Sequence, residues 1–468
     1  MIIQMKEKMH KFEKKYSNLD SSMFTIGEVN VLPLIRREIK FNYLSEKKEK
    51  IVTNHGRIRM HELFKVFVFF FKSVGQILTI FKYKNKRFLF LGFSRRSKLL
   101  NGNYLDKFHD PIIDCLDVND CIMIEKPFKQ QHERDRSTSA PIIDYDFFTY
   151  TSLAIATLIT PIIFCVFLRK FKLMRQLLEK EFRRSFKGNY WLSHVFSKFL
   201  VDAFFARIVV QIIRPEILIV TSRWLHYPFI YVCKNKGVHI VELQHGCVMK
   251  TNFFYDDFNE TPFQIDTMAV FSDQWKDRYW NAKQVVVFGL KQTYLDKSNN
   301  AEDDNLELPK SVLVISQPEM CSKLSEDLEH LAASNSRVDF HVKLHPQDID
   351  NYHVRYKRLT NLNNVSFISG FEADTRELVR NYALVLGYTS TVLFEALDVG
   401  CSVGLISSDE VGIEEYQGYY GSMVDYFNIV DRDGILYFDL LVNQKISARI
   451  FSNLNEIAIN RFFYEAYI

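Results

Sequence analysis

The sequence predicts an α/β protein whose two parallel sheets lie in two doubly wound domains. Apolar runs of four to six residues, uncharged on both faces, alternate with helical stretches, which is typical of strands covered on both sides. The first regular series, from residue 216, reads EILIVTS, VHIVELQHG, TMAVFSD and QVVVFG. After the acidic connector YLDKSNNAEDDNLELPK, a second series reads SVLVISQP, VDFHVKLHP, NVSFIS, ALVLGYTST and SVGLIS. Two series joined by one linker therefore predict two domains.

Length and composition agree with this organisation and exclude several classes of protein. A chain of 468 residues, 47% hydrophobic and 25% charged, is long enough for two or three globular domains. Its net charge of +4 is too small to indicate a nucleic-acid partner. The seven Cys show no C-x-x-C spacing, so we expect reduced thiols and neither a zinc site nor disulfides. The charged N-terminus MIIQMKEKMHKFEKKYSN lacks the apolar core of a signal peptide, so we expect a cytoplasmic protein.

The domain boundaries follow from these shifts in pattern. Within the first domain we expect early strands at Phe88–Phe93 and Cys121–Glu125, separated by a charged loop. The predicted divisions are an extension without assigned role (1–60), the first domain (61–290), a linker (291–305), the second domain (306–450) and a C-terminal helix that packs back across the first domain (451–468).

Two apolar stretches of the first domain raise the question of membrane contact. For Leu63–Phe81, a buried helix is favoured over a helix on an anionic membrane surface. Residues 147–168, the start of an apolar helical region over 147–187, contain no charge and are long enough to span a bilayer. Their Thr and Ser residues, Pro161 and the lack of a second span favour a buried helix. Peripheral attachment to the inner face of the cytoplasmic membrane is the alternative, through the basic residues Arg169, Lys170, Lys172, Arg175, Arg183 and Arg184.

Polar residues follow several of the predicted strands. In doubly wound sheets, ligands bind at the carboxyl ends of the strands, so we expect these residues to converge on one cleft. The strand ends read Gln244-His245-Gly246, Ser316-Gln317-Pro318, Lys343-Leu344-His345-Pro346 and Tyr388 to Thr391.

The stretch Ala383–Gly404 predicts a strand, a loop and a helix. Ser390 or Thr391 can cap a helix that runs to about Asp398, before Gly400 stops it. A helix that begins at the carboxyl end of a parallel strand directs its backbone N–H groups at the ligand edge, where phosphate is the usual ligand. Glu395 lies one turn beyond Thr391, where its carboxylate can accept hydrogen bonds from ribose hydroxyls. An ordinary capped helix with a partly exposed Glu explains this motif alone equally well.

The segment KLHP can provide further contacts to phosphate. Lys343 can act as a point charge and His345 as a donor, with Pro346 fixing the turn. By itself KLHP is more often a structural turn, but a phosphate-type helix start on a neighbouring strand reverses that preference. Gly246 lets the backbone beside His245 approach a ligand closely. The sequence lacks G-x-G-x-x-G, Walker A, G-x-S-x-G and D-x-D motifs, which argues against oxidoreductases, nucleotide and serine hydrolases, and metal-dependent transferases.

Together, VELQHG, KLHP and GYTSTVLFEAL resemble bacterial GT-B glycosyltransferases of capsule and surface polysaccharide synthesis. The similarity is greatest to capsule and lipopolysaccharide enzymes that use CMP-activated sugars, the sialyltransferases and Kdo transferases. This resemblance extends from about residue 210 to about residue 410. It implies a GT-B fold, with two Rossmann-like domains facing a cleft, and a metal-independent inverting enzyme without a cofactor, because the nucleotide sugar is its substrate. The expected acceptor is a surface polysaccharide or glycolipid.

The resemblance also assigns residues. The HP motif contacts the donor phosphate in those families, which implies that His345 and Pro346 do so here. The hydroxyl pair Ser390 and Thr391 corresponds to their second phosphate contact, and Glu395 to the carboxylate that meets ribose. With the strand-end residues, the predicted donor-binding set is Gln244, Gly246, Gln317, Lys343, His345, Pro346, Tyr388, Ser390, Thr391 and Glu395, with no metal ligand.

The general base is less well specified. The resemblance implies an Asp or Glu of the first domain, but the sequence has no clean acidic triplet. Asp106, Asp110, Asp114 and His245 are candidates, and Asp110 is preferred because His109-Asp110-Pro111 follows a strand-end loop. The predicted catalytic residues are Asp110, His245 and His345.

Three other functions fit the same motifs. A hydrolysing nucleotide-sugar epimerase and a CDP-polyol phosphotransferase are enzymes that share this fold. A catalytically inactive transferase that supports a capsule-assembly complex is the alternative that is not an enzyme.

Overall fold

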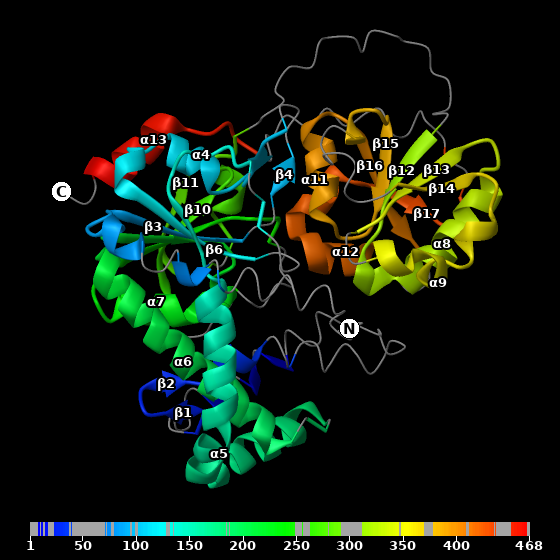
Figure 1. Ribbon diagram of the computed structural model, residues 1–468. Coiled ribbons are helices and arrows are strands. Elements are labelled where there is room, and N and C mark those ends of the chain that lie inside the picture. The colour runs from blue at the N-terminus through cyan, green and yellow to red at the C-terminus, as the bar shows by residue number, and fades with distance from the viewer. Residues whose placement is uncertain are drawn as a thin grey trace. The chain divides into compact units, whose positions relative to one another are not determined.

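The computed structural model describes residues 23–36 and most of 79–465, together with isolated positions before and between these ranges. The longer gaps within 79–465 are 249–254, 256–262, 292–310, 369–377 and 437–450. The predicted linker lies outside the described residues except for Lys291, as does most of the apolar stretch that begins at Leu63. The chain forms two compact units (Figure 1). Unit 1 comprises Met1–His245, Asn252–Gly289 and Asn455–Ile468, and unit 2 comprises Gly246–Thr251 and Leu290–Leu454.

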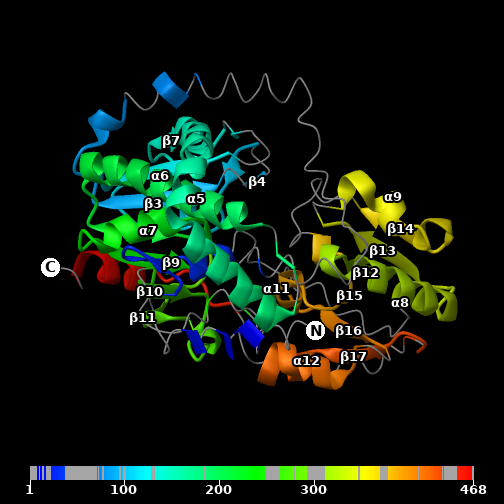
Figure 2. The ribbon, with the colours of Figure 1, turned by 90° about the horizontal axis from the view of Figure 1, so that it is seen from below.

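Unit 1 contains a seven-stranded parallel sheet of order β11-β10-β9-β8-β3-β6-β7. Its strands are β3 (Phe88–Phe93), β6 (Cys121–Lys126), β7 (Ile142–Asp144), β8 (Ile217–Val220), β9 (His239–Leu243), β10 (Ile265–Val270) and β11 (Ala282–Val287). The chain builds outward from β3 to β7 and then returns to β8 on the other side of β3. Figure 2 shows β7 on one side of β3 and β9, β10 and β11 on the other. The apolar runs predicted as early strands are therefore confirmed.

Helices lie on both faces of this sheet, whose central strands β3 and β8 are apolar on both sides (Figure 1). The α-helices among the described residues of this unit are α4 (Asp110–Asp114), α5 (Asp146–Phe182), α6 (Asn189–Ile213), α7 (Tyr227–Lys234) and α13 (Glu456–Asn460), which a π-helical turn (Arg461–Glu465) extends. Two small antiparallel ladders pair β1 (Thr25–Ile26) with β2 (Val29–Asn30) and β4 (Ser97–Lys98) with β5 (Tyr104–Leu105). The C-terminal segment packs on unit 1, where Phe463 contacts Phe88 with ring centroids 5.4 Å apart.

The helix α5 differs from the buried helix that the sequence favours. It has 37 residues and a kink at Phe167, whose φ and ψ are −110° and 18°. Only 17% of its most apolar 18-residue window is buried, and among the described residues it is the one helix long and apolar enough to cross a membrane. The prediction of a buried helix is therefore wrong for most of this stretch.

Unit 2 contains a six-stranded parallel sheet of order β14-β13-β12-β15-β16-β17. Its strands are β12 (Ser311–Ile315), β13 (Asp339–Lys343), β14 (Val365–Ile368), β15 (Leu384–Gly387), β16 (Ser402–Ser407) and β17 (Asn428–Asp431). Its α-helices among the described residues are α8 (Cys321–Ser334), α9 (Tyr352–Arg355), α11 (Thr391–Asp398) and α12 (Ile413–Tyr420). A Cβ at Gly404 would lie 2.6 Å from the side chains of Leu386 and Val430, so only glycine fits between these strands.

Both sheets have the same winding. Numbered in chain order within each unit, their strands run 3-2-1-4-5-6, and unit 1 adds one further strand after the sixth. This is the strand order of the Rossmann fold, in which the direction of winding reverses between strands 1 and 4. The predicted fold class, GT-B with two Rossmann-like α/β domains, is confirmed at the level of each unit.

Candidate functional site

The winding of unit 2 reverses between β12 and β15, and polar residues follow both strands. Gln317 follows β12 and Thr389 follows β15. The amide Oε1 of Gln317 accepts a hydrogen bond from the backbone N–H of Thr389 at 2.9 Å, and its Nε2 donates to Thr389 Oγ1 at 2.8 Å. These bonds fix the two loops at the point where doubly wound sheets bind nucleotides.

The helix α11 begins beside this point. Ser390 is its N-cap, with extended φ and ψ of −81° and 144°, and its Oγ accepts from the backbone N–H of Val392 at 3.3 Å. The helix ends before Gly400, which has a φ of +82°. The predicted strand, loop and capped helix are therefore confirmed. Because α11 follows a parallel strand, its positive end lies at the carboxyl edge of the sheet.

The backbone of Gly246 and Cys247 lies against the start of α11. Thr391 Oγ1 accepts a hydrogen bond from the N–H of Cys247 at 3.4 Å. A Cβ at Gly246 would lie 3.5 Å from the same oxygen, in ordinary contact distance. The short segment that carries Gly246 thus belongs to unit 2. Gly246, the last residue of the QHG motif, therefore lies beside Thr391 of the STxxxE motif.

A third loop at this edge follows β13. The side chain of Lys343, at the last position of the strand, is largely buried. Ser316 Oγ accepts from the backbone N–H of His345 at 2.7 Å and donates to Asp348 Oδ2 at 3.4 Å. Asp348 is fully buried and also accepts from Arg355 and from Tyr356 Oη. This network fixes the KLHP turn against β12, although Pro346 itself lies outside the described residues.

Not every predicted donor-binding residue presents its side chain at this edge. Tyr388 is buried, and its hydroxyl donates to Asp327 Oδ2 at 2.6 Å, so the side chain anchors α8 instead. Gln244 belongs to unit 1, where its buried Oε1 accepts from the backbone N–H of Phe271 at 2.9 Å. Glu395 is half-buried in α11, one turn beyond Thr391. The side chains of Tyr388 and Gln244 therefore support the fold, and we correct their assignment as donor-binding residues.

In unit 1, His245 follows β9 with aromatic side chains around it. Its Nε2 lies 2.9 Å from Ser222 Oγ, and its Nδ1 lies 3.4 Å from Tyr255 Oη. The ring of Trp224 is 5.5 Å from the imidazole, centroid to centroid. Ser222 has a φ of +54°, an uncommon conformation for a residue other than glycine that occurs often at functional sites. His245 itself is half-buried. The structure thus holds an oriented imidazole at the carboxyl edge of the unit 1 sheet.

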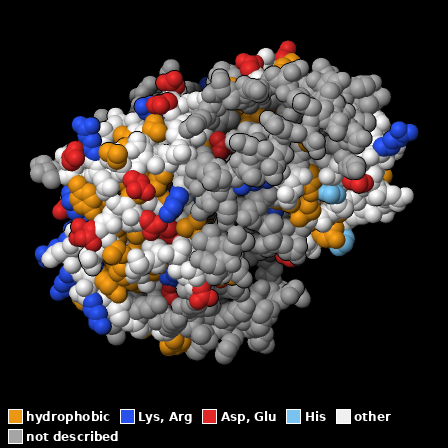
Figure 3. Space-filling model, turned by 90° about the horizontal axis from the view of Figure 1, so that it is seen from above, with side chains coloured by type: hydrophobic (Ala, Val, Ile, Leu, Met, Phe, Trp, Pro, Cys, Tyr) orange, Lys and Arg blue, Asp and Glu red, His pale blue; other side chains and the backbone are white. Residues whose placement is uncertain are grey.

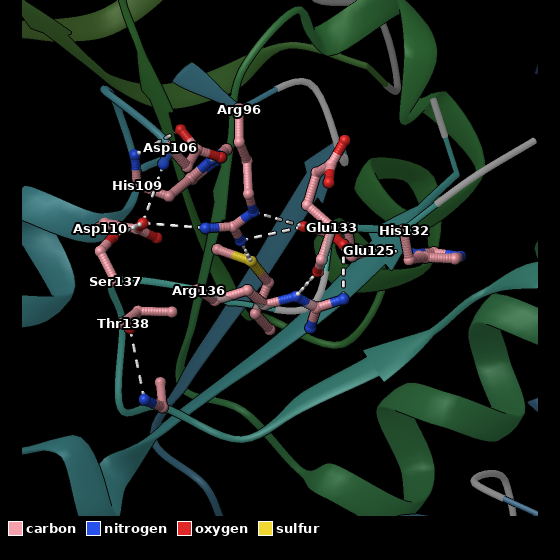
Figure 4. Close-up of polar contacts among 12 residues, drawn as sticks. Arg96, Asp106, His109, Asp110, Glu125, His132, Glu133, Arg136, Ser137 and Thr138 are labelled. Atoms are coloured by element: carbon pink, nitrogen blue, oxygen red, sulfur yellow. Dashed lines mark hydrogen bonds and ion pairs between the residues drawn. The ribbon is translucent and has the colours of Figure 1, made fainter. Parts of the chain in front are cut away.

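Asp110, the preferred base from the sequence, lies inside a buried ion-pair network (Figure 4). Its Oδ2 accepts from Arg96 Nη1 at 2.9 Å and from Ser137 Oγ at 2.6 Å. The other side of the Arg96 guanidinium binds Glu125 at 2.9 Å. Burial, together with the nearby Asp106, raises the pKa of Asp110 above its usual value although Arg96 opposes the shift. An acceptor hydroxyl has no direct access to Asp110 in this position.

The other two carboxylate candidates also differ from a catalytic base. Asp106 is buried and binds His109 Nδ1 at 2.8 Å. Burial raises its pKa, but the contacts with His109 and Arg96 outweigh this and lower the pKa to about 2. Asp114 is exposed at the end of α4.

A second part of the network surrounds His132. Glu125, His132 and Asp144 have donor atoms within 4.8 Å of one another, a spacing that can hold a metal ion. However, these atoms already have partners. His132 Nδ1 faces Glu125 Oε1 and Asp144 Oδ1, and its Nε2 lies 2.6 Å from Asp146 Oδ2. Arg136 binds Glu125 Oε1 as well, at 2.9 Å. A metal ion would have to displace Arg136 and the imidazole proton. The cluster is therefore better explained as an ion-pair network than as a metal site.

We expect the His132 cluster to make the stability of the protein depend on pH. Burial lowers the pKa of His132, but its bonds to Asp146 and Glu125 outweigh burial and raise the pKa to about 9. Protonated His132 therefore stabilises the fold fully below about pH 6.5, and this contribution is lost as the pH rises through about 9. The free energy of unfolding of the native protein minus that of a His132→Gln variant, from urea titrations, should fall by on the order of 2 kcal/mol over this range. A difference that does not change with pH would contradict the assignment.

The structure adds three residues that the sequence analysis did not single out for a role. Ser222 orients His245, Asp348 fixes the KLHP turn, and Thr389 joins the two loops of unit 2. Thr389 lies within the predicted strand end and could have been found there. Ser222 and Asp348 act through partners distant in sequence, so no local pattern indicates them.

Comparison with known proteins gives only distant similarities. No protein-family profile and no curated protein matches the sequence. Among solved structures, UDP-GlcNAc 2-epimerase from Methanocaldococcus jannaschii is 10% identical, with 80% of this chain and 98% of that chain covered and a TM-score of 0.45. MurG from Acinetobacter baumannii is 12% identical, with coverages of 81% and 98% and a TM-score of 0.44. CalG4, the calicheamicin glycosyltransferase, is 11% identical, with coverages of 81% and 93% and a TM-score of 0.39. Similarities at this level assign neither a reaction nor a ligand.

Proposed function

We propose that the protein is a metal-independent glycosyltransferase that moves a sugar from a nucleotide sugar to a surface polysaccharide or glycolipid. The observation that supports this most strongly is in unit 2. The capped start of α11, the Gln317–Thr389 pair and the KLHP turn all lie at the carboxyl edge of a sheet with Rossmann winding. This edge is where such sheets bind nucleotides, and the helix start favours a phosphate there.

The residues of unit 2 have distinct roles in the proposed reaction. Lys343, His345 and the N–H groups at the start of α11 stabilise the negative charge of the departing phosphate. One preorganised donor of this kind typically lowers a barrier by about 2.7 to 4 kcal/mol. Glu395 accepts hydrogen bonds from the ribose hydroxyls. By the resemblance of the motifs, the donor is a CMP-activated sugar.

Unit 1 provides the base. His245 accepts the proton of the acceptor hydroxyl, the acceptor oxygen forms a bond to the anomeric carbon, and the bond from that carbon to the phosphate oxygen breaks. The nucleotide leaves with the bonding electron pair, and the configuration at the anomeric carbon inverts. His245 is preferred over Asp110 because it is half-buried and held by Ser222, whereas Asp110 is enclosed by its ion pairs. His345, the third predicted catalytic residue, assists the leaving group.

Thermal unfolding with nucleotides tests the donor site. A ligand that binds only the folded state, at about 100 times its dissociation constant, stabilises the protein by about 2.7 kcal/mol. Among CMP, CDP, UDP, GDP and their common sugars, we expect CMP or a CMP-sugar to raise the melting temperature by a few degrees. His345→Ala should abolish this shift, whereas His353→Ala, a change of an exposed histidine in the same unit, should retain it.

The other outcomes distinguish the alternative functions. A shift with UDP or GDP compounds alone would contradict the CMP assignment but retain the transferase. Product formed from the nucleotide sugar without an acceptor would favour an epimerase, and consumption of CDP-glycerol would favour a CDP-polyol phosphotransferase. No shift with any nucleotide would favour the inactive scaffold. The cytoplasmic location stays a prediction.

A further inference from the structure

The first half of α5 is amphipathic in the opposite sense to a helix of a soluble domain. Its exposed side includes large apolar residues, which we call the α5 ridge: Leu153, Leu158, Ile162, Val166 and Leu168, exposed by 47%, 76%, 64%, 65% and 41%. Its buried side includes Ser152, Ala156 and Thr160, all fully buried. A surface helix normally turns its apolar stripe to the core and its polar residues to water. Here the small and polar residues face the protein.

The contacts between α5 and α6 explain this inversion. Ser152, Ala156 and Thr160 are spaced four residues apart, which allows the two helices to pack closely. Ser193 Oγ of α6 donates to the backbone oxygen of Thr160 at 3.0 Å, and Ser152 Oγ donates to Asp202. Inside membranes the hydrophobic effect does not drive helices together. Close packing of small residues and interhelical hydrogen bonds hold them together instead. Large side chains are therefore left for the outer surface.

The charges of α5 are distributed so that an anionic surface would attract the helix. Residues 147–178 contain no Asp or Glu, and the basic residues Arg169, Lys170 and Lys172 come directly after the kink at Phe167. Arg169 and Lys172 are exposed. Beyond them the charges are mixed, because Glu179 and Glu181 flank Lys180. On the face of the molecule in Figure 3, acidic and basic side chains are instead interspersed. The helix thus joins an apolar ridge to a basic segment, with the change at the kink.

The connections of α5 show what kind of membrane contact is possible. The helix α5 packs against α6 (Figure 1). It follows β7, and α6 leads into β8 of the same sheet. The hairpin of α5 and α6 therefore leaves the sheet of unit 1 and returns to it. Its inner side carries α6, which contains the ion pair between Lys198 and Asp202 at 2.6 Å. This geometry permits insertion of one side of α5 into a membrane surface but argues against a single span.

We propose that the α5 ridge inserts into the surface of a bilayer rich in anionic lipid, with Arg169, Lys170 and Lys172 bound to headgroup phosphates. The ridge covers 16 residues, about 24 Å of helix, and lies along the interface between headgroups and acyl chains. The basic residues add electrostatic attraction and make binding depend on lipid charge and on salt. This docking surface is independent of the proposed transferase activity, since it involves no residue of the donor site or of the base.

Co-sedimentation with vesicles tests the proposal. The full-length protein should bind vesicles of phosphatidylcholine with about 40% phosphatidylglycerol, bind pure phosphatidylcholine at least tenfold more weakly, and be released by about 0.5 M NaCl. The variant Leu158→Gln/Ile162→Gln/Val166→Gln should lower the apparent affinity at least tenfold. The variant Arg169→Gln/Lys172→Gln should reduce the preference for anionic vesicles.

Matched variants control for general effects of exposed residues. Val354→Gln/Ile413→Gln/Ile457→Gln removes three exposed apolar side chains elsewhere, and Lys84→Gln/Lys357→Gln removes two exposed charges. Both should bind like the native protein, and thermal unfolding should show that all variants fold. Equal binding of the ridge variant and the native protein would overturn the proposal. So would a dimer of the native protein in analytical ultracentrifugation that the ridge variant lacks, because the ridge would then bind a second copy of the chain.

Discussion

A His245→Gln variant should transfer sugar about 10² to 10⁴ times more slowly than the native protein and remain folded. The imidazole is half-buried, and Ser222 Oγ lies 2.9 Å from its Nε2, so the side chain is oriented without being part of the core. Gln keeps a polar group of similar size but cannot accept the proton of the acceptor hydroxyl. The expected loss is in kcat, with little change in KM for the donor, because the proposed donor site lies in unit 2.

The measurement is a steady-state transfer assay with the donor that the thermal shifts identify. A His353→Gln variant, changed at an exposed histidine, should keep native activity. The pH profile provides a second readout, since the acidic limb of kcat/KM should disappear when the base is removed. Full activity of His245→Gln, together with loss of activity and an unchanged melting temperature in Asp110→Asn, would identify Asp110 as the base instead.

An Arg96→Met variant should lower the free energy of unfolding by about 3 to 5 kcal/mol. The Arg96 side chain is fully buried and contacts Asp110 and Glu125, both of which are also buried. Removing the guanidinium leaves Asp110 without its cation in a site that water does not reach, and this is the costly way to break a buried ion pair. Urea titration measures the change.

Arg358→Met is the matched control for this loss. Arg358 pairs with Glu329 at 3.2 Å, and the two side chains are 60% and 40% exposed, so water replaces the interaction. A surface pair of this kind contributes about 0 to 1 kcal/mol. Similar losses in the two variants would contradict the structural role of the Arg96 network. If Arg96→Met loses activity but keeps the native melting temperature, the Arg96 network has a catalytic role instead of a structural one.

Local patterns in the sequence were sufficient for most strands of the two sheets and for the polar loops at the carboxyl edge of the unit 2 sheet. Strands buried on both faces need continuous apolar runs, so β3 and β15 could be placed from their runs of apolar residues. The cap at Ser390 and the stop at Gly400 are also local, because each depends on the conformation of one or two residues. The rule that parallel sheets bind ligands at their carboxyl edge then located Gln317, Lys343 and His345.

Only the tertiary structure decided where individual side chains point. Tyr388 and Gln244 follow strands as the neighbouring site residues do, but Asp327 and the backbone of Phe271 bind them inside the fold. Asp110 is enclosed because the fold brings Arg96 and Ser137 to it. In α5, an apolar run without charges has no periodic contrast that would mark its inner face, and its packing against α6 left the large side chains outside. The sequence determined which segments are apolar, and contacts between distant residues determined which side of each segment is covered.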